Sequence, residues 1–156
     1  MNQIASLLAL PHIMLDVEIG NKRQLFELLG QRYSQELGVA PTLILDSLLA
    51  REKLGSTGLG QGVAVPHGRI KGLKTAAGIL VRLDPAIDFD APDRLPVNLV
   101  FILFVPLNAT DLHLQILGEL AQLFSDKTLR QALSASNDSA DAFELIRNWQ
   151  PWLNHD

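Results

Sequence analysis

The sequence predicts an α/β fold in which helices pack on one sheet of modest size. A short stretch of alternating apolar and polar residues and two strongly apolar runs are typical of strands. The longer intervals show helical periodicity, at residues 22–37, 41–53 and 111–149. The 156 residues contain no internal repeat, linker or low-complexity tract, so we expect one domain over residues 1–156.

The first third of the chain predicts a strand and two helices. Residues 13–19 alternate apolar and polar side chains, which indicates a half-buried strand. Apolar residues recur at helical spacing from Lys22 to Leu37, and Gly38 supplies a stop. A second helix is expected to begin at Pro41 and to end at about Lys53. Its apolar stripe includes Arg51, which places an arginine on an inward face.

The second half predicts two strands followed by helices. Residues 76–83 and 97–105 are apolar runs, and the second is nearly continuous, as expected of a strand covered on both faces. Residues 111–149 are helical in pattern, with breaks near Ser125-Asp126 and at residues 136–138, where Asp or Ser can cap the next helix. His113 begins an apolar stripe on the first of these helices, so a histidine faces the predicted sheet.

Residues 55–72 differ from the rest of the chain, because they hold six of its 11 glycines. A short strand over Val63–Val65 is expected to end at Pro66, which places His67 on a stiff turn. The glycines offer backbone N–H groups with little steric cover, as in an anion-binding nest, and Ser56 and Thr57 add hydroxyls. The segment therefore predicts phosphate handling at a histidine.

Composition excludes several classes of function. The chain has no cysteine, which excludes a disulfide framework, a thiol nucleophile and a cysteine-ligated zinc. Its 13 basic residues are scattered and its net charge is −4, which argues against nucleic acid as a partner. Residues 1–15 do not resemble a secretory signal, and residues 99–105, the longest apolar run, are too short to span a bilayer. We expect a soluble, cytoplasmic protein without membrane insertion.

Familiar catalytic motifs are also missing. The segment is not a Walker A loop, because Gln61 and Gly62 follow Gly60 where lysine and a hydroxyl residue would be needed. It is not a Rossmann fingerprint either, because the glycine spacing does not open a helix after a strand. No Gly-x-Ser-x-Gly elbow occurs, and the histidines lack the His-Glu-x-x-His spacing of zinc proteases. His12 and His155 lie in terminal regions without comparable surroundings, and we assign them no functional role.

Each remaining candidate also has an ordinary structural interpretation. A Pro-His-Gly turn is usually a surface turn, Arg51 in a last helical turn can simply complement the helix dipole, and His113 alone is typical of a half-buried residue at a helix start. Their combination with the glycine-rich segment favours a site, because a rigidly placed imidazole, a cation and free backbone N–H groups occur together.

One pattern runs through this region: Arg51-Glu52, Leu54 to Gly58, Gly60, Gly62, Ala64 and Pro66 to Gly68. It resembles the active-site signature of the mannitol/fructose-type enzyme IIA domains of the bacterial phosphoenolpyruvate-dependent phosphotransferase system. The resemblance extends over nearly the whole chain, including His113-Leu114 and residues 121–127. The chain departs from the family pattern at Gln61, Val63 and Val65, which affects the choice of branch and not the chemistry.

The resemblance implies a three-layer α/β fold with a mixed sheet and a histidine that a small histidine-containing phosphocarrier protein phosphorylates. By position, His67 is the phosphoacceptor, His113 the second active-site histidine and Arg51 the charged neighbour of the phosphoryl group. Residues expected to bind the phosphoryl group are Ser56, Thr57 and Gly68. A neutral imidazole can attack a phosphohistidine directly, so the chemistry requires no metal or cofactor.

The resemblance leaves three functions open. The Leu54 to Gly58 form and the lack of a IIB or IIC domain resemble the nitrogen-regulatory branch, which favours a phosphocarrier that regulates protein targets. The alternative is a stand-alone sugar-specific, fructose/mannitol-type IIA that passes the phosphoryl group to a separate IIB domain. A third possibility is a regulatory binding module that acts through protein–protein contact and is only switched by phosphorylation.

Overall fold

The computed structural model describes residues 2–109 and 111–150. The described strands are β1 (Ile13–Val17), β2 (Gly58–Gly60), β3 (Val63–Ala64), β4 (His67–Ile70), β5 (Ala77–Ile87) and β6 (Val97–Pro106). They form one mixed sheet in the order β1-β5-β6-β3-β2, and β4 also pairs with β6. The β5–β6 and β2–β3 pairs are antiparallel, whereas β1–β5, β3–β6 and β4–β6 are parallel.

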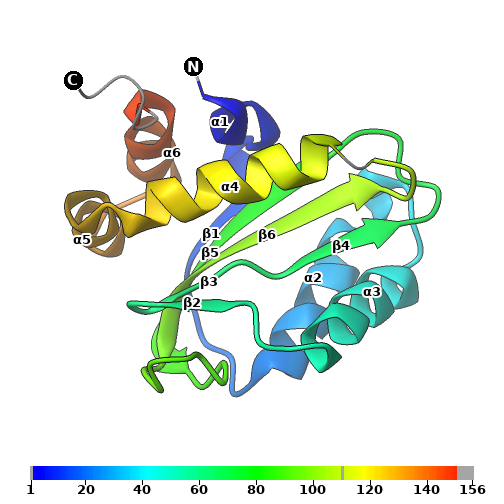
Figure 1. Cartoon of the computed structure of the whole chain (residues 1–156), viewed down its shortest axis with the longest axis horizontal. Helices are drawn as coiled ribbons and strands as arrows, with labels where there is room; N and C mark the ends of the chain where they lie inside the picture. Colours follow the sequence, from blue (N-terminus) through cyan, green and yellow to red (C-terminus); the bar gives the residue numbers. More distant parts are fainter. Residues whose placement is uncertain (1, 110, 151–156) are drawn as a thin grey trace.

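Helices cover both faces of this sheet (Figure 1). The described helices are α1 (Gln3–Leu7), the short 3-10 helix η1 (Leu10–His12), α2 (Lys22–Leu37), α3 (Pro41–Lys53), α4 (Asp111–Ser125), α5 (Lys127–Ala135) and α6 (Ser139–Asn148). α2 and α3 pack on one face, and α4 crosses the other with α1, α5 and α6 beside it. The expected three-layer α/β fold with a mixed sheet is confirmed.

The apolar run at residues 97–105 becomes the central strand β6. Phe101 and Leu103 pack with α4, whereas Ile102 and Phe104 pack with α2 and α3. Because successive strand residues point to opposite faces, a strand between two helical layers is apolar at nearly every position. β6 therefore anchors both layers, and β3 and β4 lie along its edge.

Local signals account for the helix boundaries. Gly38 ends α2 in a left-handed conformation with φ of 73°, and Pro41 is the first residue of α3, so both helices have their predicted bounds. The predicted strand over residues 13–19 ends earlier, at Val17, because Asp16 has a φ of 56° and the register with β5 shifts there. α1 is an additional element, with Asn2 as its N-cap.

Within residues 2–109 and 111–150, no helix combines the length and apolar character needed to cross a membrane.

Candidate active site

His67 is the first residue of β4. The sequence predicted a turn at this position, and that prediction was wrong: after Pro66 the chain runs on along β6, with His67 opposite Leu103. The Pro66 carbonyl accepts a hydrogen bond from the Leu103 N–H at 2.9 Å, so strand pairing begins at the proline itself. The imidazole is therefore carried by a residue of the sheet.

The two ring nitrogens of His67 have different partners. Nδ1 donates to the Val65 carbonyl oxygen at 2.9 Å. Because a carbonyl oxygen can only accept, this bond requires the proton on Nδ1 and leaves the lone pair on Nε2. Nε2 in turn accepts a hydrogen bond from Nε of Arg51 at 3.2 Å. The nitrogen with the lone pair thus faces the guanidinium.

The Arg51 guanidinium lies between His67 and the glycine-rich segment. Arg51 is in the last turn of α3, and its Nη1 donates to the Gly55 carbonyl oxygen at 2.8 Å. The residue is half-buried. Two directed bonds therefore orient a permanent positive charge toward Nε2 of His67.

His113 approaches the same imidazole from the opposite helical layer. It lies in the first turn of α4, and its ring centroid is 5.1 Å from that of His67, with the two rings nearly perpendicular. Its buried Nδ1 has no hydrogen-bond partner among the described residues. An unpartnered buried polar nitrogen is uncommon in proteins, and it singles out His113 among the residues of this site. The structure thus brings Arg51, His67 and His113 together from α3, β4 and α4.

Both imidazoles favour the neutral form. Burial lowers the pKa of His67 below its usual value of 6.5, and Arg51 lowers it further, while the Val65 carbonyl and Glu52 act in the opposite sense. Burial likewise lowers the pKa of His113, and nearby positive charge adds to the effect. At pH 7 the site therefore presents an uncharged nitrogen nucleophile beside a fixed cation.

The glycine-rich segment is less open than the sequence predicted. Residues 58–64 form the β2–β3 hairpin, which turns at Gln61 and Gly62 with positive φ angles. The Ser56 hydroxyl donates to the Phe89 carbonyl oxygen, and the Thr57 hydroxyl and N–H donate to Glu52. Both hydroxyls are thus bonded within the chain, and their binding of a phosphoryl group stays a prediction.

Gly68 has a clear packing role. It lies on β4 where α3 crosses, and a Cβ atom there would lie 3.2 Å from Cβ of Ser47 and in direct conflict with its Oγ. The close approach of helix and strand explains the glycine beside His67. A role of Gly68 in phosphoryl binding also stays a prediction.

Glu52 is the residue of this region that the sequence reasoning missed as a functional candidate. Its carboxylate is buried, with 6% of the side chain exposed, and accepts a hydrogen bond from Lys22 Nζ at 3.0 Å. A glutamate near a helix end is normally solvent-exposed. The only sequence features that could have identified Glu52 as a functional candidate are the adjacent Arg51 and the threonine five positions later.

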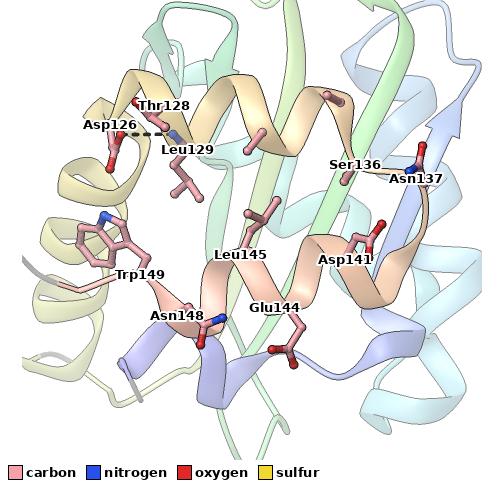
Figure 2. Close-up of a pocket in the computed structure, with 12 residues that line it drawn as sticks. Asp126, Thr128, Leu129, Ser136, Asn137, Asp141, Glu144, Leu145, Asn148 and Trp149 are labelled. Atoms are coloured by element: carbon pink, nitrogen blue, oxygen red, sulfur yellow. Dashed lines mark hydrogen bonds between the residues drawn. The ribbon is translucent and has the colours of Figure 1, made fainter.

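Neither His12 nor the groove between α5 and α6 contributes to this site. His12 is buried with its ring nitrogens near the Gly78 carbonyl oxygen (3.1 Å) and Glu36 (2.8 Å), so it ties η1 to β5 and α2. His155 lies outside the described residues. A groove of about 560 Å³ runs between α5 and α6, beside Trp149 and Leu145, and has no histidine in its lining (Figure 2). Among the described residues no group of three or more His, Cys, Asp or Glu could hold a metal ion.

Comparisons with known proteins agree on one family. The family model "Phosphoenolpyruvate-dependent sugar phosphotransferase system, EIIA 2" matches residues 6–149. A nitrogen regulatory protein of Klebsiella oxytoca is 36% identical over 131 residues, which cover 83% of this chain and 81% of the relative.

Solved structures show the same architecture. The crystal structure of the nitrogen regulatory protein IIA-Ntr from Neisseria meningitidis superposes with a TM-score of 0.88 at 46% identity, over 93% of this chain and 99% of the other. The IIA mannitol protein of Escherichia coli, at 22% identity and a TM-score of 0.75, covers 89% of this chain and 98% of its own and shares the fold.

Proposed function

The chain belongs to the EIIA 2 family of the phosphoenolpyruvate-dependent sugar phosphotransferase system, and on that premise we propose that it is a phosphocarrier and regulator that accepts a phosphoryl group on Nε2 of His67. The donor is a histidine-containing phosphocarrier protein of a nitrogen-type system. The observation that carries the proposal is the pairing of the His67 nitrogens, with Nδ1 bonded to the Val65 carbonyl oxygen and Nε2 facing Arg51.

Transfer at this site follows from that pairing. The lone pair on Nε2 forms the new bond to phosphorus while the donor's nitrogen–phosphorus bond breaks, and that electron pair stays on the donor imidazole. His67 keeps its proton on Nδ1, so no base has to remove it. Arg51 stabilises negative charge on the transferring oxygens as they arrive. His113 stands close enough to donate one hydrogen bond to the phosphoryl group as a neutral imidazole.

The surroundings of His67 suit docking of a second protein. Leu114, next to His113, is 71% exposed, and Leu54, next to Gly55, is 84% exposed. Exposed leucines that adjoin site residues in the chain are typical of a contact surface, because each loses apolar area to a partner. The two exposed leucines therefore support a protein, rather than a small molecule, as the donor.

We assign the output to regulation of protein targets. The support is the similarity to two proteins named as nitrogen regulatory proteins, over most of both chains. The alternative output is transfer to a separate sugar-specific IIB domain. The two share the chemistry at His67 and differ only in what the phosphorylated protein contacts.

Reconstitution with purified general phosphotransferase components tests the proposal. Phosphoenolpyruvate is expected to label the protein through the phosphocarrier, and the label is expected to be acid-labile, base-stable and absent from His67→Ala. Addition of fructose- and mannitol-type IIB domains then separates the outputs, since the regulatory assignment predicts negligible onward transfer. Rapid transfer to a IIB domain would establish the sugar-specific alternative, and labelling of His67→Ala would refute the assignment of the phosphoacceptor.

A further inference from the structure

A buried carboxylate joins α3 to the glycine-rich segment. Glu52 accepts hydrogen bonds from the Thr57 N–H at 3.2 Å, from the Thr57 hydroxyl and from Lys22 Nζ at 3.0 Å. Only 6% of the Glu52 side chain and 21% of the Lys22 side chain are exposed. A carboxylate with this little solvent contact needs its partners, so the bonds to Glu52 fix where the chain goes after α3.

These bonds act on the residue beside Glu52. Arg51 donates to the Gly55 carbonyl oxygen at 2.8 Å, and Gly55 lies between Glu52 and Thr57 in the chain. Holding Thr57 against Glu52 therefore also holds the carbonyl that orients Arg51. Since the same guanidinium contacts Nε2 of His67 at 3.2 Å, a chain of direct contacts leads from Glu52 to the reactive nitrogen.

A second attachment fixes the other side of the segment. The Ser56 hydroxyl donates to the Phe89 carbonyl oxygen, and Lys22 Nζ donates to the same oxygen at 3.4 Å and lies 3.1 Å from the Asp90 carboxylate. The Lys22 ammonium also lies 5.3 Å from the centre of the Phe89 ring. The segment is thus held between α3 and residues 89–90, with Lys22 bonded to both sides.

We propose that Glu52 is a positioning residue for phosphoryl transfer, which holds the segment of residues 55–57 so that Arg51 stays directed at Nε2 of His67. The inference rests on the proposed function, because it assigns a role in transfer at the same site. Among the described residues no hydrogen bond joins Glu52 to His67. Glu52 acts on His67 directly only as a charge, and its positioning role runs through Arg51.

Lys22 makes a carboxylate acceptable at this position. A buried negative charge near the transferring phosphoryl group would repel it, and the ammonium of Lys22 opposes that repulsion. Asp90, exposed and bonded to the same ammonium, adds to the negative charge that Lys22 must balance. An apolar residue in place of Glu52 would avoid the repulsion but would leave the Thr57 N–H and hydroxyl without an acceptor.

Two measurements together test the role of Glu52: the hydrogen-exchange rate of the Arg51 Nε–H and the rate of phosphoryl transfer to His67. NMR measures the exchange rate of the Arg51 Nε–H with water in the unphosphorylated protein. This exchange rate is expected to rise in Glu52→Ala, because Arg51 is then held less firmly. Transfer to His67 is expected to slow by up to about 10²-fold, the loss expected when a positioned group is displaced by about 1 Å. The loss should not exceed that of Arg51→Met, because the misplaced guanidinium is still present. In an Arg51→Met background the same change should have almost no further effect, because the group it positions is gone.

Conservative variants and a matched control complete the design. Glu52→Gln keeps an acceptor for Thr57 and should recover part of the rate. Thr57→Val keeps the charge of Glu52 and removes one donor, so it tests the attachment even if Glu52→Ala fails to fold. Glu144→Ala is the control, since Glu144 is an exposed glutamate paired with Arg147 on α6.

Two results would overturn the inference: an unchanged exchange rate of the Arg51 Nε–H in Glu52→Ala, or rate losses of Glu52→Ala and Arg51→Met that multiply in the double variant. Failure of the parent protein to accept any phosphoryl group would count against the proposed function alone. The exchange measurement would still decide whether Glu52 positions Arg51.

Discussion

Removal of the Arg51 guanidinium is expected to slow phosphoryl transfer to His67 about 10²-fold while changing stability little. Two unit charges 4 Å apart attract by about 4 kcal/mol at an effective dielectric constant near 20. Loss of one preorganised donor to a developing anion costs about 2.7–4 kcal/mol in barrier height. Because Arg51 is half-buried and partly screened by water, we expect the lower end of this range. Arg51→Met keeps the apolar stem and removes only the charge and the donors.

Rapid-quench transfer from the phosphorylated carrier measures the rate, and thermal unfolding measures stability. A second readout needs no donor: Arg51 lowers the pKa of His67, so the pKa of His67 in Arg51→Met should rise, as followed by NMR titration. Arg51→Lys keeps the charge without the forked donors, so its transfer rate should lie between those of the parent protein and Arg51→Met. An unchanged transfer rate with a lowered melting temperature would refute the reasoning and make Arg51 a structural residue.

Three further predictions concern His113, the pH dependence of stability and the packing of Gly68. His113→Gln should still allow phosphorylation of His67, because an amide donates a hydrogen bond, but should slow onward transfer, since an amide cannot take up a proton; equal rapid-quench rates in both half-reactions would remove His113 from the site. Folding lowers the pKa of both histidines, so the unfolded chain binds protons first and stability should decline as pH falls below 6.5, measured by urea unfolding. The decline of stability with falling pH should be shallower in His113→Gln. An unchanged pH dependence would contradict the lowered pKa of His113. Gly68→Ala should destabilise the protein by about 1–3 kcal/mol through overpacking against Ser47, and Ser47→Ala should restore part of that loss; a neutral Gly68→Ala would contradict the packing role.

The sequence predicted those parts of the fold that depend on local signals. Gly38 and Pro41 mark helix ends by backbone chemistry, and the apolar run that forms β6 indicated burial on both faces. The strand order was not predictable, since pairings such as β1 with β5 join residues far apart in the chain. His67 was assigned to a turn for the same reason, because its pairing with Leu103 is not a local property.

Three of the site residues were identifiable from sequence, and the supporting residues were not. Two sequence features indicated functional residues: Arg51 lies on an apolar helical stripe, and His113 begins another. Each places a polar group where an apolar one is usual. The burial of Glu52 was not predictable from the sequence, because its partner Lys22 lies in a different helix. The hydrogen bond from the Ser56 hydroxyl to the Phe89 carbonyl oxygen was likewise not predictable, because Phe89 lies in a loop distant in sequence.

The position of the phosphoryl group tests the central claim most directly. The ¹⁵N-labelled protein would be phosphorylated from phosphoenolpyruvate through the general components, and the ring nitrogen bonded to phosphorus identified by NMR, with mass spectrometry to locate the modified residue. The account predicts one phosphoryl group, on Nε2 of His67, with the proton retained on Nδ1 toward the Val65 carbonyl oxygen. A phosphoryl group on Nδ1 of His67 or on His113, or none at all, would contradict it.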